Sequence, residues 1–304
     1  MKAIVFEEFG GPEVLAFTDA ETPDAGPGQV RVEVAVAGVN ALDYKIRRGY
    51  MEAVRPTPLP AIPGLEVAGI VDQLGEGVTG LAVGDEVVGW SATGAYAQYA
   101  LADADALVRK PAGLDWETAV ALPVAGETSQ RVLDLLDLAE GETLLLHGGA
   151  GAVGSIAIQL AVSRGATVVA TASAANHDYL RVLGAIPVTY GDGLAERVRE
   201  AAPQGVDAVF DVAGKGALPD SIELRGGSKD RIVTIADPKA AELGVLFSGG
   251  GTARPQDGLA EQVRLAADGE LRVEVARVFA LAEASDGQRV SEEGHTRGKL
   301  VLKV

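Results

Sequence analysis

A glycine-rich stretch between Leu144 and Ser173 constrains the fold of this chain more than any other feature. It reads LLLHGGAGAVGSIAIQLAVSRGATVVATAS and passes from an apolar run, through a glycine turn, into apolar residues at helical spacing. A second β-branched run, residues 167–171, follows the break at Gly165. This order predicts strand, turn, helix and strand, which is the βαβ unit that connects two parallel strands.

The glycines of this turn predict a nucleotide site. Gly149 permits the tight turn, Gly151 lets a pyrophosphate approach the backbone, and Gly154 lets the helix and strand pack closely. Ala152 and Val153 then open the helix, whose N-terminus favours an anion. We interpret the unit as a dinucleotide site. A purely structural glycine turn, or another nucleotide ligand, is the alternative.

The residues after the second predicted strand indicate which dinucleotide binds. Units that bind NAD carry an acid about 20 residues beyond the motif, where it accepts hydrogen bonds from the ribose. Here no acid precedes Asp178, whereas Ser173 and Asn176 are neutral and Arg181 follows one helical turn later. This pattern favours NADP(H). In the alternative interpretation, Ser173 and Asn176 only cap a helix and Arg181 is solvated.

Composition excludes several classes of partner. The net charge of −17 repels nucleic acid and anionic membrane surfaces, and no apolar run approaches the roughly 18 residues of a membrane span. We therefore expect a soluble, cytoplasmic protein that binds neither nucleic acid nor membranes. Without cysteine there is no disulfide or thiolate zinc site, and His147, His177 and His295 stand too far apart to predict a metal centre.

The remaining chain predicts two kinds of architecture. Short strands separated by Gly and Pro turns indicate a barrel-like domain at residues 3–6, 30–36, 69–74, 85–89 and 95–100. After Pro111, helices are predicted at residues 119–122 and 129–138, and strands that alternate with helices at residues 144–147, 168–171, 186–190, 208–211 and 232–235. A helix at 259–268, a strand at 272–277, a short helix containing Leu281 and Ala282, and a strand at 299–304 complete the chain.

Several motifs occur in an order that resembles a known superfamily. They are GVNALDYKIRRG from Gly38, PGLEVAGIV from Pro63, GDEVVG, GAYAQY, the glycine turn, LGA and the closing GKLVL. Together they resemble the medium-chain dehydrogenase/reductases, and within them the zinc-free quinone oxidoreductase branch, which includes ζ-crystallin-like proteins and enone reductases.

The resemblance implies an α/β fold class with two domains and a cleft between them. A GroES-like, mainly β barrel domain would comprise residues 1–116 and 249–304, and a Rossmann domain with a doubly wound parallel sheet residues 117–248. It also implies a homodimer joined edge to edge through the Rossmann sheets, and the apolar run at 245–247 is compatible with such an unpaired edge. Zinc-dependent relatives have Cys at Asn40 and Gly-His-Glu where this chain has Gly64-Leu65-Glu66. We therefore expect no zinc, and a carbonyl polarised by hydrogen bonds.

The resemblance also implies the substrate residues. Asn40 matches a cleft residue, and Lys45 is our preferred group for stabilising an enolate or relaying a proton, with Tyr44 second. Asp43 is expected to orient its neighbours or cap the turn. In the alternative interpretation, Lys45 is a solvated helix residue and Tyr44 a packing residue.

Further cofactor contacts follow from matching positions. Thr128 matches a residue that contacts the carboxamide or phosphate, Tyr190 an adenosine contact, and Ala213 the nicotinamide edge. Phe247 and Ser248 are expected to flank the nicotinamide or the substrate mouth, and Arg297 to reach a phosphate.

Three functional hypotheses remain open from the sequence. The first is an NADPH-dependent reductase of quinones or α,β-unsaturated carbonyl compounds. The second is an enoyl reductase of a polyketide-type biosynthetic pathway, which shares every motif. The third belongs to a different class, a protein that binds NADPH with little turnover. Each requires the same cofactor, because the glycine turn and the second-ribose loop are common to all of them.

Overall fold

The computed structural model describes residues 1–250 and 256–304 and divides the chain into two compact units. The first unit comprises Met1–Val124 and Arg254–Val304, and the second comprises Ala125–Ala253. The sequence predicts boundaries after residues 116 and 248, somewhat earlier than this division. No helix in the described residues is long and apolar enough to cross a membrane.

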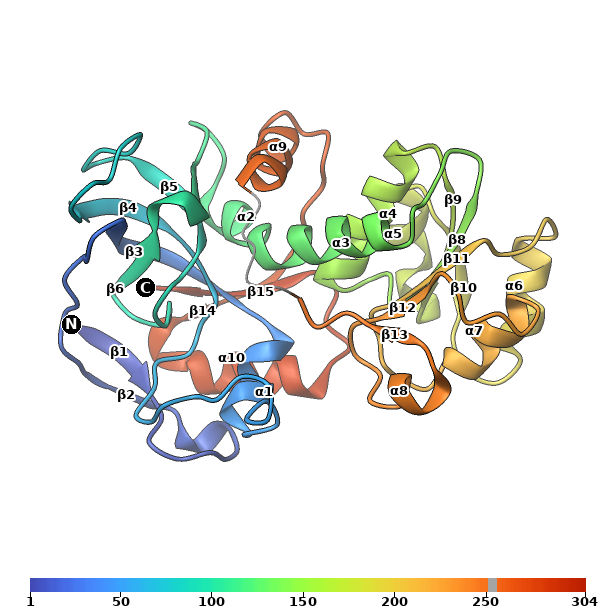
Figure 1. The fold of residues 1–304 in the computed structure, drawn as a ribbon, viewed down its shortest axis with the longest axis horizontal. Helices are drawn as coiled ribbons and strands as arrows, with labels where there is room; N and C mark the ends of the chain where they lie inside the picture. Colours follow the sequence, from blue (N-terminus) through green and yellow to red (C-terminus); the bar gives the residue numbers. More distant parts are fainter. Residues whose placement is uncertain (251–255) are drawn as a thin grey trace. The chain divides into compact units, whose positions relative to one another are not determined.

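The first unit is rich in strands (Figure 1). Its strands are β1 (Lys2–Val5), β2 (Ala16–Asp19), β3 (Gln29–Val39), β4 (Glu66–Leu74), β5 (Glu86–Trp90), β6 (Tyr99–Asp103), β7 (Leu107–Arg109), β14 (Val275–Ala280) and β15 (Lys299–Lys303). Its helices are α1 (Ala41–Arg47), α2 (Trp116–Val120), α9 (Gln256–Ala267) and α10 (Ala284–Glu293), with short 3₁₀ turns at Pro12–Val14, Ala104–Ala106 and Leu281–Glu283.

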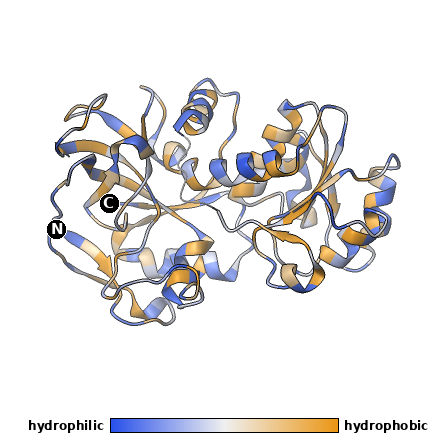
Figure 2. Ribbon diagram, in the orientation of Figure 1, coloured by the Kyte–Doolittle hydropathy of each residue, from blue (hydrophilic) through white to orange (hydrophobic). Residues whose placement is uncertain are grey.

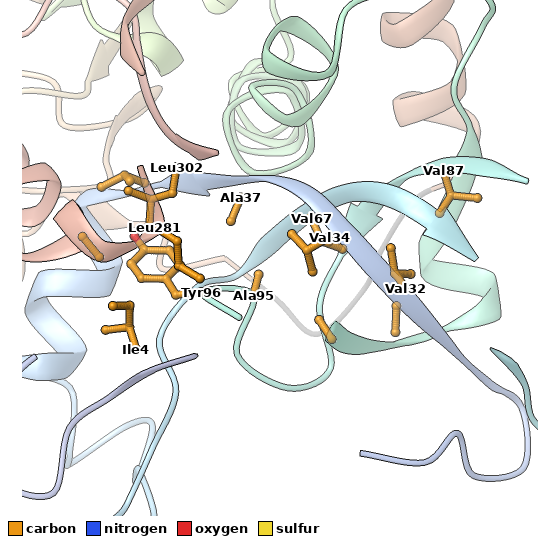
Figure 3. Close-up of a cluster of buried hydrophobic side chains, with 14 of the residues drawn as sticks. Ile4, Val32, Val34, Ala37, Val67, Val87, Ala95, Tyr96, Leu281 and Leu302 are labelled. Carbon is orange, nitrogen blue, oxygen red and sulfur yellow. The ribbon is translucent and has the colours of Figure 1, made fainter. Parts of the chain in front are cut away.

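The main sheet of this unit is ordered β14-β15-β3-β4-β5-β7, and β6 also pairs with β3. Alternate residues of β3, such as Val32 and Val34, point into a buried cluster with Val67 of β4 (Figure 3). Tyr96 lies in the same cluster and is completely buried. Helix α2 packs on β3 and β4, which explains why the first unit extends beyond residue 116.

The second unit is an alternating α/β fold. Its elements are α3 (Pro123–Leu135, which starts at the boundary), β8 (Thr143–His147), α4 (Ala152–Ser163), β9 (Thr167–Ala172), a 3₁₀ turn (Ala174–Asn176), α5 (His177–Val182), β10 (Ile186–Thr189), α6 (Leu194–Ala201), β11 (Ala208–Asp211), α7 (Leu218–Leu224), β12 (Ile232–Thr234), α8 (Ala240–Leu243) and β13 (Leu246–Phe247).

The strands of this unit form a parallel sheet in the order β10-β9-β8-β11-β12-β13. The order confirms the predicted doubly wound fold. Helices cover both faces of the sheet, with α4 and α5 above it and α7 and α8 below it in the view of Figure 1. In Figure 2 the strands of this unit are hydrophobic along their length, as expected for a sheet buried on both faces.

Several predicted elements differ from the structure. The helices expected at 119–122 and 129–138 are α2 and α3, which begin earlier, at Trp116 and Pro123. The strand expected at 95–100 begins only at Tyr99, because residues 95 and 96 bond to the 63–64 segment instead and Ala97 forms an isolated bridge with Ala3. The strand expected at 272–277 is β14, shifted toward the C-terminus by its pairing with β15. The short helix expected near Leu281 continues as α10, whose buried face packs on α1.

Candidate functional site

The glycine turn of the second unit has the geometry that the motif predicts. Strand β8 ends at His147, Gly148 takes a φ of +87°, and the Gly149 N–H donates to the Thr171 carbonyl of β9 at 2.9 Å. A Cβ on Gly154 would overlap the Gly148 carbonyl oxygen. Only glycine allows this close approach between the first turn of α4 and the end of β8.

The N-terminus of α4 is suited to an anion. Gly151 is its N-cap residue and provides no side-chain hydrogen bond, so the first N–H groups, which begin at Ala152 and Val153, have no capping side chain. These groups carry the positive end of the helix dipole, which favours a phosphate at this position. The turn therefore fits the pyrophosphate of a dinucleotide.

The strand order places this turn at the switch point of the sheet. The chain leaves β8 toward β9 on one side, whereas its other neighbour, β11, leads to β12 on the opposite side. Ligands of doubly wound sheets bind at the carboxyl ends of such strands. Ala213 and Gly214 follow β11 there, and both backbone N–H groups donate to Asp211 Oδ1 at 3.0 Å.

Asp211 and His147, the last residues of β11 and β8, form hydrogen bonds at this edge of the sheet. Asp211 is fully buried, and its Oδ2 accepts a hydrogen bond from Thr234 Oγ1 at 2.8 Å. His147 Nε2 lies 2.9 Å from Ser221 Oγ. Burial lowers the pKa of the His147 imidazole, while the nearby Asp211 carboxylate opposes the shift. Burial therefore favours the neutral form of His147 at the end of β8.

The predicted second-ribose residues lie together after β9. Ser173 precedes the 3₁₀ turn Ala174–Asn176, and Asn176 Nδ2 donates to Ser173 Oγ at 3.2 Å. Arg181 follows on α5, but its guanidinium forms an exposed ion pair with Asp178 at 2.6 Å. An incoming phosphate would therefore compete with Asp178 for Arg181.

Other predicted cofactor residues of this unit lie on its helices and strand ends. Thr128 is buried on α3, while Tyr190 after β10 and Phe247 on β13 are about half exposed, at 49% each. Ser248 accepts a hydrogen bond from Arg131, which also pairs with Glu127. The neighbour of Thr128, Ser129, ties α3 to α4 because its Oγ donates to the Val153 carbonyl at 3.0 Å.

Arg297, unlike these residues, belongs to the first unit. It lies just before β15 and pairs with Glu274 at 3.0 Å. The structure does not bring it together with the glycine turn within one unit.

One of the predicted substrate residues, Asn40, belongs to a buried polar network that we call the Asn40 cluster, made of Asn40, Asp43, Glu66, Tyr96 and Lys299. Asn40 is the N-cap residue of α1, Glu66 begins β4, and Lys299 begins β15. Asn40 Nδ2 donates to Glu66 Oε1 at 2.8 Å, and Lys299 Nζ donates to Asn40 Oδ1 at 2.6 Å. Lys299 also forms a buried ion pair with Glu66.

Asp43 has the orienting role expected of it. Its Oδ2 accepts the Asn40 backbone N–H at 2.8 Å and the Tyr96 hydroxyl at 2.9 Å. Burial raises the pKa of the Asp43 carboxyl to about 7, and these two hydrogen bonds oppose the shift. Burial and the adjacent Asp43 raise the pKa of Tyr96 well above its ordinary value.

Tyr44 and Lys45 occupy the next positions of α1 and are partly buried. Burial raises the pKa of Tyr44, with a smaller contribution from Glu292, and burial lowers the pKa of Lys45. A partly desolvated lysine holds its proton less firmly than a solvated one. Partial burial argues against the fully solvated alternative for Lys45, and its chemical role stays a prediction.

The Asn40 cluster does not fit a zinc ion. Asn40 and Glu66 already bind the Lys299 ammonium group, and a second cation beside it would be repelled. Within residues 1–250 and 256–304, no group of three or more His, Asp or Glu side chains could hold a metal. Zinc independence itself stays a prediction of the sequence.

Sequence reasoning missed the roles of Glu66, Tyr96 and Lys299. The positions are far apart along the chain, and no periodicity links them. The available signal was local: Glu66 and Lys299 are charged residues that directly precede the apolar runs VAGIV and LVL, where burial is expected. A charge at such a position needs a partner, but the sequence does not say which one.

Comparisons with known proteins agree with this architecture. The family described as Alcohol dehydrogenase GroES-like domain matches residues 26–112, and the family described as Zinc-binding dehydrogenase matches residues 183–302. A quinone oxidoreductase of Pseudomonas aeruginosa is 32% identical over 99% of this chain and 99% of its own. A chloroplastic NADPH-dependent alkenal/one oxidoreductase of Arabidopsis thaliana is 31% identical over 99% of this chain and 79% of its own. The structure of Escherichia coli quinone oxidoreductase complexed with NADPH has a TM-score of 0.87 and 27% identity, with 100% of both chains covered.

Proposed function

Because the chain belongs to the medium-chain dehydrogenase/reductase superfamily, and within it to the quinone oxidoreductases, we propose that it is an NADPH-dependent reductase of quinones or α,β-unsaturated carbonyl compounds. The observation that carries the proposal is the glycine turn. It lies at the switch point of a doubly wound sheet, under the uncapped N-terminus of α4. NADPH supplies the hydride when bound.

The second unit is assigned the cofactor. Gly149, Gly151, Ala152, Val153 and Gly154 hold the pyrophosphate, because their backbone groups line the turn and the first turn of α4. Ser173 and Asn176 accommodate the second ribose and its phosphate, and Arg181 turns from Asp178 toward that phosphate. Thr128, Tyr190, Ala213, Phe247 and Ser248 complete the set for the nicotinamide and adenosine, and Arg297 is proposed as a phosphate contact from the first unit.

We assign to the first unit the residues that bind the carbonyl group of the substrate. Transfer of a hydride to a conjugated carbon leaves negative charge on a carbonyl oxygen, which needs a hydrogen-bond donor. Asn40, Tyr44 and Lys45 are the candidates, since all three lie at or on α1. The proton that completes the reduction comes from Lys45, Tyr44 or solvent.

Stopped-flow oxidation of NADPH against quinones, enones and enoyl thioesters tests the activity. We expect turnover with quinones or enones and little with NADH. Fast turnover restricted to enoyl thioesters would assign the chain to the polyketide-type alternative. Tight NADPH binding with no turnover on any member of the panel would contradict the reductase proposal and favour the binding protein.

A homodimer is proposed from the edge strand β13. Leu246 and Phe247 are about half exposed there, at 52% and 49%, and their strand pairs with β12 on one side. Leu246→Lys places a charge on this edge and should convert the dimer to monomer in sedimentation velocity. A wild-type monomer at micromolar concentration contradicts the proposal.

Cytoplasmic localisation stays a prediction, which cell fractionation would check.

A further inference from the structure

The Asn40 carboxamide is fixed in one orientation by two charged side chains. Lys299 can only donate a hydrogen bond and the Glu66 carboxylate can only accept one. With Lys299 Nζ 2.6 Å from Asn40 Oδ1, and Asn40 Nδ2 2.8 Å from Glu66 Oε1, both amide groups have complementary partners. The flipped amide would place its NH₂ against the ammonium and its oxygen against the carboxylate.

The two charged residues are themselves held in place. Glu66 Oε2 accepts the Val124 backbone N–H at 2.9 Å, so both of its oxygens are engaged. Its side chain lies against Gly38 of β3, where any Cβ would overlap Glu66 Oε1. Lys299 is nearly fully buried at the start of β15, which pairs with β3. The network therefore rests on three neighbouring strands rather than on a loop.

Stability alone is a weak explanation for this ion pair. Burying a carboxylate and an ammonium group carries a large desolvation cost, and well-packed apolar residues in their place are often as stable. The ion pair does fix the orientation of the Asn40 carboxamide, because a donor on one side and an acceptor on the other distinguish its oxygen from its nitrogen.

We propose, on the basis of the reductase function above, that Lys299 and Glu66 are positioning residues that hold Asn40 as the hydrogen-bond donor to the substrate's carbonyl oxygen. An amide nitrogen carries two hydrogens, and Glu66 accepts one of them. The second remains for the substrate. The ammonium on Oδ1 polarises the amide and strengthens that donor.

The reaction balances with this assignment. The β-carbon of the enone receives a hydride from NADPH, the C=C electron pair shifts to form an enolate, and its oxygen accepts the Asn40 N–H. The α-carbon then takes a proton from Lys45, Tyr44 or solvent, and NADP⁺ and the saturated ketone are released. Because Asn40 is only 9% exposed, its hydrogen bond acts where little water competes.

Three variants test the positioning role. Glu66→Gln combined with Lys299→Gln removes both charges, retains hydrogen bonding and lets the amide take either orientation. We expect kcat for an enone to fall about 10²-fold, with the NADPH dissociation constant unchanged within twofold. Asn40→Ala should cause a similar loss, and the triple variant should be no slower than Asn40→Ala. Multiplicative losses, or normal kcat in the double variant, would overturn the inference.

The matched control neutralises another buried lysine of the same unit. Lys110 is nearly buried and pairs with Glu86 at 2.8 Å, away from the Asn40 cluster contacts. Glu86→Gln with Lys110→Gln should retain kcat within twofold.

A second readout uses a series of para-substituted aryl enones, whose rates should become more sensitive to electron withdrawal when Asn40 is no longer fixed. An unchanged sensitivity would indicate a merely structural role.

Binding of 4-nitrophenolate, followed by its absorbance, separates this inference from the reductase function. The phenolate mimics an enolate oxygen and needs no turnover. We expect the wild type to bind the anion at least tenfold more tightly than the Glu66→Gln, Lys299→Gln variant does. Phenolate binding without NADPH oxidation would refute the reductase and support the donor site. If the protein oxidises NADPH but wild type and variant bind phenolate equally, the reductase function is supported and the donor site is refuted. If the protein neither oxidises NADPH nor binds phenolate more tightly than the variant does, both proposals are refuted.

Discussion

Two buried titratable side chains, His147 and Asp43, shift their pKa values in opposite directions. Burial disfavours the charged form in both cases. For a histidine this lowers the pKa, and for a carboxyl group it raises the pKa. The two residues therefore give opposite dependences of stability on pH, and they lie in different units.

Replacing His147 with Gln should remove part of the acid sensitivity of the fold. Above about pH 6.5 the imidazole is neutral in both states. Below that pH the unfolded chain binds the proton first, so the free energy of unfolding falls until the folded pKa is reached, by about 1.4 kcal/mol for each pKa unit. Urea unfolding between pH 8 and pH 5 measures this slope. His295→Asn, at an exposed position, is the control; equal slopes in wild type and His147→Gln would refute the explanation.

Asp43→Asn should have the opposite effect. The folded pKa of about 7 lies above the ordinary value, so this carboxyl adds stability at low pH that is lost as pH rises through 7. The uncharged variant should therefore become more stable relative to wild type between pH 6 and pH 8. Thermal unfolding at matched ionic strength measures the difference. Asp105→Asn, at an exposed position, should show no such trend; a flat Asp43→Asn difference would contradict the raised pKa.

At the scale of elements, the packing of α4 on β8 determines the cofactor turn. Gly154→Ala places a methyl group against the Gly148 carbonyl and must push the helix from the strand. We expect a loss of about 1–3 kcal/mol in stability and at least tenfold weaker NADPH binding. Isothermal titration and urea unfolding measure the two effects.

The matched control for this substitution is Gly258→Ala in α9. Nothing lies within 4 Å of the Cβ that it would add. Alanine should stabilise this helix by about 0.5–1 kcal/mol and leave NADPH binding unchanged. If Gly154→Ala behaved like Gly258→Ala, the close contact would have no role in the turn.

Elements stabilised by interactions local in the sequence were predicted more closely than elements that depend on contacts distant in the sequence. The βαβ stretch was predicted closely, because its strand and helix patterns are local. The 95–100 segment was wrong because backbone bonds to residues 63 and 64 outcompete strand pairing there. Helix α10 was underestimated because its buried face is completed by α1 and β15, which are distant in sequence.

At the scale of the whole molecule, the choice of dinucleotide is testable. Ser173→Asp introduces the acid that NAD-binding units carry after the second strand. We expect kcat/KM for NADPH to fall at least tenfold while that for NADH changes little or rises. Steady-state kinetics with both cofactors measure the ratio. Ser163→Asp adds the same charge at an exposed position at the end of α4 and should leave the ratio unchanged. An equal ratio in Ser173→Asp and wild type would remove the role of Ser173.

The sequence by itself determined the parts of this protein that local chemistry dictates. The spacing of Gly149, Gly151 and Gly154 predicted the nucleotide turn, because backbone conformation and close approach depend on residues within one turn. The missing acid before Asp178 pointed to NADP(H) for the same local reason. The ordered motifs predicted both the fold and the family.

The tertiary structure alone decided how the Asn40 cluster is built. Positions 40, 66 and 299 meet because β3, β4 and β15 are neighbours in one sheet, and this pairing involves contacts far apart in the chain. Burial of a charge creates the need for a partner, but the partner's identity depends on which strands lie side by side. For the same reason, the pKa of about 7 at Asp43 arises from packing that no sequence pattern contains.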